Sequence, residues 1–433
     1  MRISSRDHLA LESEMNENFI PFHRPSIGEE EINEVTDTLR SGWLTTGPRA
    51  VRFERVFREH VGAPYAIAVN SATAALHLAL AGLNVGPGDE VITTPLTFCA
   101  TVQAILHVGA SPVLADIGSD GNIDPEAVRK CITSRTRAII PVHLAGLPCE
   151  MGAIWALACE YGMHVIEDAA HAAGAYYEGR PIGAGPTDIG AASDAVAFSF
   201  YATKNLTTGE GGMITTHRRD LAETMRMLSL HGTSHDAWDR YTEHGDWHYD
   251  VLAHGFKYNL SDIQAAIGIP QLGKLEHFIQ RRALYAGIYN RAFGGLEEVE
   301  LPPDNPRCRH AWHLYILRLN LQRLKIDRAQ FIGELRQKGI GTSVHFIPIP
   351  LHRFFARLPL ANNPCPRALL LFPRIVSLPL YPAMTEDQVH YVAQRVREIV
   401  EHSRRVPFVA LGASAQGISP RASKPFGSSE EDL

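Results

Sequence analysis

The chain has 433 residues, of which 45% are hydrophobic, and a formal net charge of -6. This length exceeds what one hydrophobic core usually serves, so we expect two domains. The negative charge and the lack of a concentrated basic stripe argue against a nucleic-acid platform, and no apolar run is long enough to span a membrane.

The cysteines and the N-terminal residues indicate the cellular compartment of the protein. The six cysteines show no C-x-x-C pair and no zinc-ligand spacing, so we expect reduced thiols and no metal site. Residues 1–18 carry acidic side chains and lack an apolar core, which is not the pattern of a secretory signal. We therefore expect a soluble, cytoplasmic protein.

The first part of the chain predicts strands that alternate with helices. A capping box at Ser26–Glu29 starts a helix that ends at Gly42. The expected strands are Tyr65–Val69, Glu90–Thr93, Pro112–Ile117, Ala138–His143, the runs that end at Asp168 and at Phe200, and Met213–Thr216. The expected helices between them are Ser71–Leu80, about Phe98–His107 and Met151–Tyr161. This alternation indicates an α/β fold with a largely parallel sheet that helices cover on both faces.

The rest of the chain predicts a smaller α+β unit. A capping box formed by Ser261 and Gln264 starts a linking helix toward Arg282. The later expected elements are a strand at Trp312–Leu319, a helix at Arg328–Lys338, a strand at Thr342–Phe346 and a final helix capped by Thr385. We divide the chain into a flexible N-terminus (1–18), a large domain (19–270), a small C-terminal domain (271–405) and a disordered tail (406–433) rich in Ser, Gly, Ala and Pro.

A lysine and a carboxylate follow two of the buried strands. Lys204 comes directly after the apolar run that ends at Phe200, and Asp168 ends the run His164–Asp168. The first 250 residues contain only one other lysine, Lys130, which lies in a charged helical segment. A lysine and an aspartate at the ends of neighbouring strands suit a binding site for pyridoxal phosphate (PLP). In such a site the lysine forms a Schiff base with the cofactor, and the aspartate pairs with its protonated pyridine nitrogen.

A phosphate site is predicted where the first strand turns into a helix. At Asn70–Thr73 the backbone N–H groups and the Ser71 and Thr73 hydroxyls can point at an anion, and Ser199 is a further hydroxyl donor. Ser71 as a plain helix N-cap is compatible with this interpretation. No G-x-G-x-x-G follows the first strand, which disfavours a nicotinamide site.

Five segments of the chain form long, ungapped motifs: Val165–Ala172, Ser199–Asn205, Gly209–Gly212, Tyr258–Ala266 and Gly341–Phe346. Together they resemble the motifs of one family, the DegT/DnrJ sugar aminotransferases. The resemblance runs from about Phe19 to His402. Ser41–Pro48 and His310–Leu314 are most similar to the UDP-4-amino-4-deoxy-L-arabinose aminotransferases within it.

The resemblance implies a fold-type-I PLP enzyme with a mostly parallel seven-stranded sheet, working as a homodimer with shared active sites. It implies that Lys204 holds the cofactor, that Asp168 contacts the ring nitrogen, and that Phe98 stacks on the ring. His171 would lie against the other face of the ring or near its oxygen, and Lys204, Asp168 and His171 would be the catalytic residues. The phosphate would be held by Ser71, Ala72, Thr73, Ser199 and the partner's Asn259, and the sugar would face Trp43, Thr45 and His345. From the residues alone, Phe98 and His171 remain open to ordinary core roles, and Asn259 to a turn-stabilising one.

The implied reaction moves an amino group from L-glutamate to a nucleotide-linked keto-sugar, at C4 of a UDP-sugar, by a ping-pong mechanism. Three alternatives stay open. In the first, the amino group goes to another position of a hexose or to a keto-cyclitol. In the second, the enzyme is a PLP-dependent sugar dehydratase, which Lys204 disfavours because related dehydratases carry histidine there. In the third, the protein is a non-catalytic regulator. The stretch Gly183–Ala192 is longer than the resemblance predicts, which leaves the sugar open.

Overall fold

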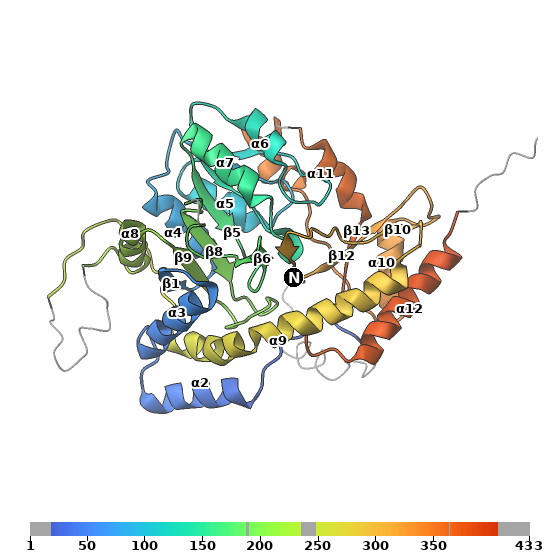
Figure 1. The fold of residues 1–433 in the computed structure, drawn as a ribbon, viewed down its shortest axis with the longest axis horizontal. Helices are drawn as coiled ribbons and strands as arrows, with labels where there is room; N and C mark the ends of the chain where they lie inside the picture. The colour runs from blue at the N-terminus through green and yellow to red at the C-terminus, as the bar shows by residue number, and fades with distance from the viewer. Residues whose placement is uncertain (1–18, 188–189, 235–247, 363, 406–433) are drawn as a thin grey trace, which may run out of the picture.

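The computed structural model describes residues 19–187, 190–234, 248–362 and 364–405. The predicted flexible N-terminus (1–18) and disordered tail (406–433) lie outside the described residues. Figure 1 shows a sheet-containing body and a smaller body side by side, with one long helix, α9, running along both.

The larger body is built on a seven-stranded sheet of order β1-β9-β8-β5-β4-β2-β3. Its strands are β1 (Tyr65–Val69), β2 (Glu90–Thr93), β3 (Ser111–Leu114), β4 (Thr136–Ile140), β5 (His164–Asp168), β8 (Ala195–Ser199) and β9 (Gly212–Thr216). The pairs from β8 to β3 are parallel, and β9 runs antiparallel between β1 and β8. The predicted, mostly parallel α/β sheet is therefore confirmed.

Helices cover both faces of this sheet, because alternate strand residues point to opposite sides. Ile67 and Val69 of β1 pack in one hydrophobic cluster and Ala66 and Ala68 in another. The first cluster includes residues of α4 (Ala72–Gly82), α5 (Cys99–His107) and α8 (Arg219–Ser229). The second includes residues of α3 (Pro48–Val61), α6 (Pro125–Cys131), α7 (Met151–Tyr161) and α9 (Asp262–Phe293).

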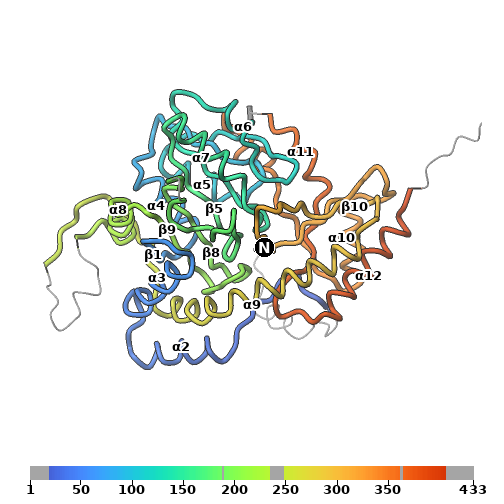
Figure 2. Tube along the Cα trace, viewed as in Figure 1, coloured from blue at the N-terminus to red at the C-terminus, as the bar shows by residue number. Residues whose placement is uncertain are grey.

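The smaller body has its own hydrophobic cluster around a three-stranded antiparallel sheet, β10-β12-β13. Figure 2 traces the chain of this body at the right of the view, mostly in orange to red. Its elements are β10 (Val299–Glu300), β12 (Tyr315–Leu319), β13 (Ile375–Leu378), α10 (Arg328–Gln337) and α12 (Glu386–His402). Helix α9 contributes to this cluster as well, through residues such as Tyr285 and Phe293. It therefore runs without a break past residue 270, where we placed the domain boundary.

The remaining elements are short, apart from the helix α2. They include the helices α2 (Glu29–Ser41) and α11 (Pro366–Leu371). A second three-stranded sheet is formed by β6 (Tyr176–Tyr177), β7 (Arg180–Pro181) and β11 (Cys308–Arg309). The described residues also form five 3-10 turns: Leu144–Gly146, Ile349–Leu351, Phe355–Arg357, Pro359–Asn362 and Phe372–Arg374.

In the described part of the chain, no helix combines the length and the apolar character needed to cross a membrane.

Two local predictions were wrong. The first helix begins after Gly28, whose backbone N–H bonds to the Glu31 carboxylate at 2.7 Å, and not after Ser26. The expected strand Thr342–Phe346 makes a single bridge, from Ser343 to Ser377, because His345 and Phe346 then turn toward a cavity. The caps at Ser261 and Thr385 were correct, each with a capping box.

Candidate active site

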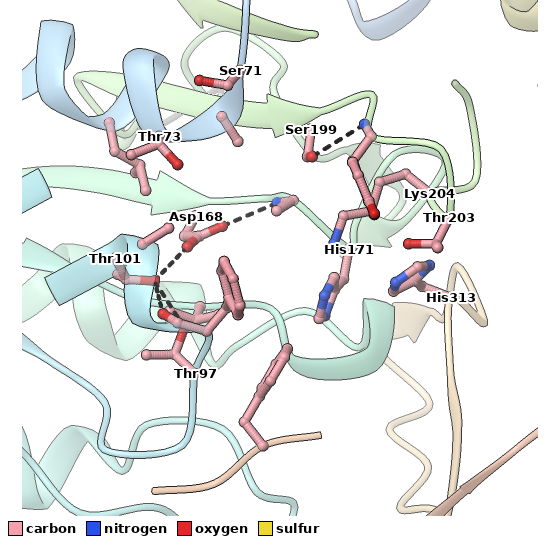
Figure 3. A pocket seen from close by; sticks show the side chains of 18 of the residues that line it. Ser71, Thr73, Thr97, Thr101, Asp168, His171, Ser199, Thr203, Lys204 and His313 are labelled. Carbon is pink, nitrogen blue, oxygen red and sulfur yellow. Dashed lines mark hydrogen bonds between the residues drawn. The ribbon is translucent and has the colours of Figure 1, made fainter. Parts of the chain in front are cut away.

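A cavity of about 510 Å³ opens at the carboxyl ends of β5 and β8. This is the edge where parallel α/β sheets bind their ligands. Figure 3 shows Asp168 with Thr101 on one side, Ser71 and Thr73 near the start of α4, and Lys204 close to His171 and His313. The cavity also receives Ala72, Thr97, Phe98, Ser199, Tyr201, Thr203, Glu210, His345 and Phe346.

Asp168 is the last residue of β5 and is 6% exposed. Its Oδ2 accepts a hydrogen bond from the Thr101 hydroxyl at 2.8 Å, and its Oδ1 accepts one from the Ala170 N–H at 3.1 Å. Burial raises the pKa of this carboxyl, while those two hydrogen bonds and the charge of Lys204 oppose the rise. The site thus holds a carboxylate at the cavity wall.

Lys204 lies in the turn after β8, where its backbone N–H bonds to the Tyr201 carbonyl at 2.9 Å. Strands β5 and β8 are paired in parallel, so Asp168 and Lys204 follow neighbouring strands as predicted. Burial lowers the pKa of Lys204 to about 8, and the Asp168 charge acts in the opposite direction. An amine with this pKa loses its proton within the range in which proteins work, which suits a nucleophile or a base.

The start of α4 forms one wall of the cavity. Ser71 is the N-cap, and its hydroxyl accepts from the Ala74 N–H at 3.1 Å. Ala72 and Thr73 occupy the first helical positions, whose N–H groups have no acceptor inside the helix. Gly212 packs so tightly here that a Cβ would come within 2.8 Å of the Ala72 nitrogen. Only a glycine lets β9 approach the helix so closely. Because Ser71, Ala72 and Thr73 all line the cavity, this helix N-terminus is suited to hold an anion there.

Rings line the other side of the cavity. Phe98 is 60% exposed, which places an apolar ring in the open cavity and not in the core. His171 is buried, and its ring stacks on Phe346 at 5.7 Å between centroids and lies 4.3 Å from the ring of His313. Burial holds the pKa of His171 well below its usual value. Its Nδ1 accepts the Ala145 N–H at 3.3 Å, so the neutral ring carries its proton on Nε2.

Two further histidines approach Lys204. His313 Nδ1 lies 3.3 Å from Asn205 Oδ1, and His345 Nδ1 lies 2.8 Å from the Ser377 hydroxyl. Burial lowers the pKa of both rings, that of His345 to about 4. Lys204 is therefore surrounded by neutral imidazoles.

Three predicted site residues lie outside this cavity. Asn259 donates from Nδ2 to the Thr46 hydroxyl at 2.6 Å, and Trp43 donates from Nε1 to the Thr46 carbonyl at 3.1 Å. The Thr45 carbonyl accepts the N–H of Asp262 at 3.1 Å. The structure thus gathers Trp43, Thr45 and Asn259 beside one another, but not at the cavity of their own chain.

Sequence reasoning gave no role to several residues that line the cavity: Thr97, Thr101, Tyr201, Thr203, Glu210, His313 and Phe346. The helical spacing from Thr97 to Thr101 was a usable signal, since it places both hydroxyls on one side of the chain as α5 begins. Tyr201 and Thr203 were visible as close neighbours of Lys204. In the described residues, no group of three His, Cys, Asp or Glu side chains is arranged to hold a metal ion.

The DegT/DnrJ/EryC1/StrS aminotransferase family model matches residues 25–397. The chain belongs to this family. It is 48% identical over 387 residues to SpsC of Bacillus subtilis strain 168, a spore coat polysaccharide biosynthesis protein, a match that covers 89% of this chain and 98% of SpsC.

Two solved structures share the fold. One is Spr1654 of Streptococcus pneumoniae, assigned as a sugar aminotransferase and solved in a PLP form and a PMP form. Its PLP form matches this chain with a TM-score of 0.80 and 33% sequence identity, and the match covers 89% of this chain and 99% of Spr1654. DesV of S. venezuelae, solved in complex with a ketimine intermediate, has a TM-score of 0.79 and 35% identity, covering 87% of this chain and 95% of DesV. The protein is therefore a PLP-dependent sugar aminotransferase of the fold-type-I class.

The residues of the cavity fit PLP. The buried Asp168 carboxylate suits a protonated ring nitrogen, and the open N-terminus of α4 suits a phosphate. The exposed ring of Phe98 suits contact with an aromatic face. Lys204 supplies an amine that is readily deprotonated. Together these groups provide one partner for each part of the cofactor.

Proposed function

We propose that this enzyme moves an amino group from L-glutamate to a nucleotide-linked keto-sugar, at C4 of a UDP-sugar. The observation that carries the proposal is the pair of Lys204 and Asp168 at the carboxyl ends of adjacent parallel strands, both lining one cavity. Family membership and the similarity to SpsC and DesV support a sugar as the amino acceptor.

We assign Lys204 two tasks. Its Nζ would hold PLP covalently, and once the donor has freed it, the neutral amine would take the proton from the donor Cα. Bound PLP supplies an electron sink that accepts the electron pair of the broken C–H bond. Burial keeps the pKa of Lys204 near 8, so a neutral amine is accessible close to physiological pH. The same Nζ returns a proton to carbon, so it acts as base and then as acid.

Asp168 holds the ring nitrogen in its protonated form. Thr101 and Ala170 each donate a hydrogen bond to the carboxylate, which favours its charged state although the group is buried. Oriented in this way, the carboxylate stabilises the positive charge on the ring nitrogen during proton removal.

Ser71, Ala72 and Thr73 at the start of α4 would hold the phosphate, with the Ser199 hydroxyl beside them. Phe98 and His171, which line the same cavity, would lie against the ring, and His345 would face the sugar. His171 presents a neutral Nε2–H, which donates a hydrogen bond without adding charge.

The active enzyme is a homodimer in this proposal. Trp43, Thr45 and Asn259 lie together outside the cavity of their own chain, so a second copy is needed to bring them to a bound substrate. In a dimer Asn259 donates to the phosphate of the other subunit, while Trp43 and Thr45 face the sugar nucleotide. Shared sites of this kind make activity dependent on assembly.

The net reaction is the sum of two half-reactions. L-glutamate gives up its amino group and a Cα proton and leaves as 2-oxoglutarate, with one water consumed. The keto-sugar then gains the amino group and a proton on carbon, with one water released. A ping-pong rate law follows from this sequence.

To test this proposal, the purified enzyme is incubated with isotopically labelled L-glutamate and with keto-sugars linked to different nucleotides. We expect the label in the amino sugar, with 2-oxoglutarate in equal amount. Transfer to a keto-cyclitol but not to any nucleotide sugar would contradict the assigned acceptor. Transfer only from another amino acid would contradict the donor.

A further inference from the structure

A second, much smaller cavity lies directly behind the catalytic one. Its volume is about 20 Å³, and one water needs about 10–15 Å³. Thr203, His313 and His345 line both cavities and so form the wall between them. The other residues around the small cavity are Phe22, His23, Leu314, Leu378 and Leu380.

His23 has an unpaired ring nitrogen at the small cavity. Its Nε2 is buried and has no hydrogen-bond partner among the residues that the structure describes. A hydrogen bond to the Ala202 backbone raises the pKa of this ring, and since Nε2 is unpaired, we assign that bond to Nδ1. Burial and the nearby Arg282 charge lower the pKa of His23 to about 3, so the ring is neutral. A neutral ring that donates from Nδ1 has a free acceptor at Nε2.

Thr203 supplies a complementary group. Thr203 lines the small cavity as well as the catalytic one. A hydroxyl both donates and accepts, and a water between it and an imidazole nitrogen satisfies both groups. His313 and His345 add imidazole edges to the same wall, so a water has the two to four polar partners that buried waters usually have.

The segment that carries His23 is fixed in the described fold. Ile20 bridges to Ile340, with its N–H 2.8 Å from the Gly339 carbonyl. The Phe22 ring stacks on His345 at 5.4 Å between centroids. His23 is therefore held against the turn that leads into Lys204.

We propose that one buried water joins His23 Nε2 to the Thr203 hydroxyl and that His23 is a positioning residue for Lys204. His23 then holds both residues that precede Lys204: Ala202 directly through Nδ1, and Thr203 through the water. The functional half of this inference rests on the role assigned to Lys204, whereas the water site does not depend on it.

The first test is a crystal structure of the holoenzyme at a resolution that shows ordered waters. We expect a water within hydrogen-bond distance, about 2.7–3.2 Å, of His23 Nε2 and Thr203 Oγ1. A dry cavity, or a direct contact from His23 Nε2 to a protein donor, overturns the water site.

Three variants then separate the two contacts of His23. His23→Gln places an oxygen near the Nε2 position and keeps the acceptor for the water, whereas His23→Asn keeps a donor near Nδ1 for Ala202. His23→Phe loses both contacts, and His390→Phe, on the exposed side of α12, is the matched control. The readouts are the rate at which the apoprotein takes up PLP, followed by absorbance, and kcat and KM for the donor.

We expect His23→Phe and His23→Asn to slow PLP uptake and lower kcat by about five- to tenfold with KM little changed, and His23→Gln to restore both. Recovery with Asn but not Gln overturns the role of the water, because the Ala202 contact alone then suffices.

A double-mutant cycle with Thr203→Val tests the link in a way that does not depend on catalysis. The thermal stabilities of His23→Phe, Thr203→Val and the double variant are compared. Two partners of one water give a non-additive loss, while additive losses contradict the shared water. If Lys204 proves not to bind PLP, the crystallographic water and this coupling still decide the inference.

Discussion

The Thr101 hydroxyl lies 2.8 Å from Oδ2 of Asp168, with both side chains buried at the cavity wall. The same hydroxyl is 2.8 Å from that of Thr97, and a hydroxyl has only one proton to donate. A carboxylate accepts but does not donate, so Thr101 donates to Asp168 and accepts from Thr97. The two threonines thus form a short chain of donors that ends at the carboxylate.

Replacing Thr101 by Val removes this donor at nearly constant volume. The hydrogen bond lowers the pKa of Asp168, so its loss raises that pKa further and favours the neutral acid. We expect turnover to fall about tenfold, equivalent to about 1.4 kcal/mol in the barrier. The loss should shrink as the pH rises, because a higher pH restores the carboxylate. A loss that is independent of pH would contradict this explanation.

The Asp168→Asn variant keeps the shape of the side chain and removes its charge. The Asp168 charge raises the pKa of Lys204, so in this variant that pKa should fall below its value of about 8. Reductive attachment of PLP to Lys204 in the apoprotein, measured by mass spectrometry across pH, reports the titration. We expect the midpoint near 8 in the parent and at lower pH in the variant. Turnover should drop by about 10²-fold because the ring nitrogen loses its partner.

Lys204→Ala should abolish the visible absorbance of the bound cofactor and reduce turnover by at least about 10²–10⁴-fold, the usual contribution of a general acid–base group. Lys130→Ala is the matched control, since Lys130 is exposed on α6 and is the only other lysine in the first 250 residues. Loss of the absorbance in the Lys130 variant, or its survival in the Lys204 variant, would refute the assignment.

Asn259→Asp tests the contribution of the second subunit. The change replaces the Nδ2–H donor by a negative charge, which repels the phosphate if Asn259 reaches the other subunit's cofactor. We expect lower PLP retention after dialysis than in the parent. Asn259→Ala, which loses the donor but adds no charge, should retain more PLP than the Asp variant. Equal retention in all three proteins would contradict the cross-subunit contact.

Much of the larger body could be predicted from sequence because its strands are short, apolar and bounded by glycine or polar residues. The expected strand Tyr65–Val69 and helix Met151–Tyr161 have the bounds found in the structure. Two of the longer helices, α3 and α8, were not predicted. Their buried residues recur every three to four positions, but polar side chains fill the rest, so mean hydropathy gives little sign of them.

The site was predictable where chemistry follows a strand end and unpredictable where it depends on turns. Asp168 and Ser199 end buried strands, Lys204 follows one, and Ser71 caps a helix, so the local pattern was enough to find them. His23 and His313 come from segments far from Lys204 in sequence, and only the packing of the smaller body against the larger one brings them near it. No local pattern encodes such a contact.

The most direct measurement is the absorbance spectrum of the purified protein before and after addition of L-glutamate. The proposed function predicts a visible band from lysine-bound PLP that falls as the band of pyridoxamine phosphate rises, with one 2-oxoglutarate formed per site. A cofactor band that does not respond to L-glutamate would contradict the proposed donor. A protein that shows no such band even after PLP is added would contradict the assignment of Lys204 itself.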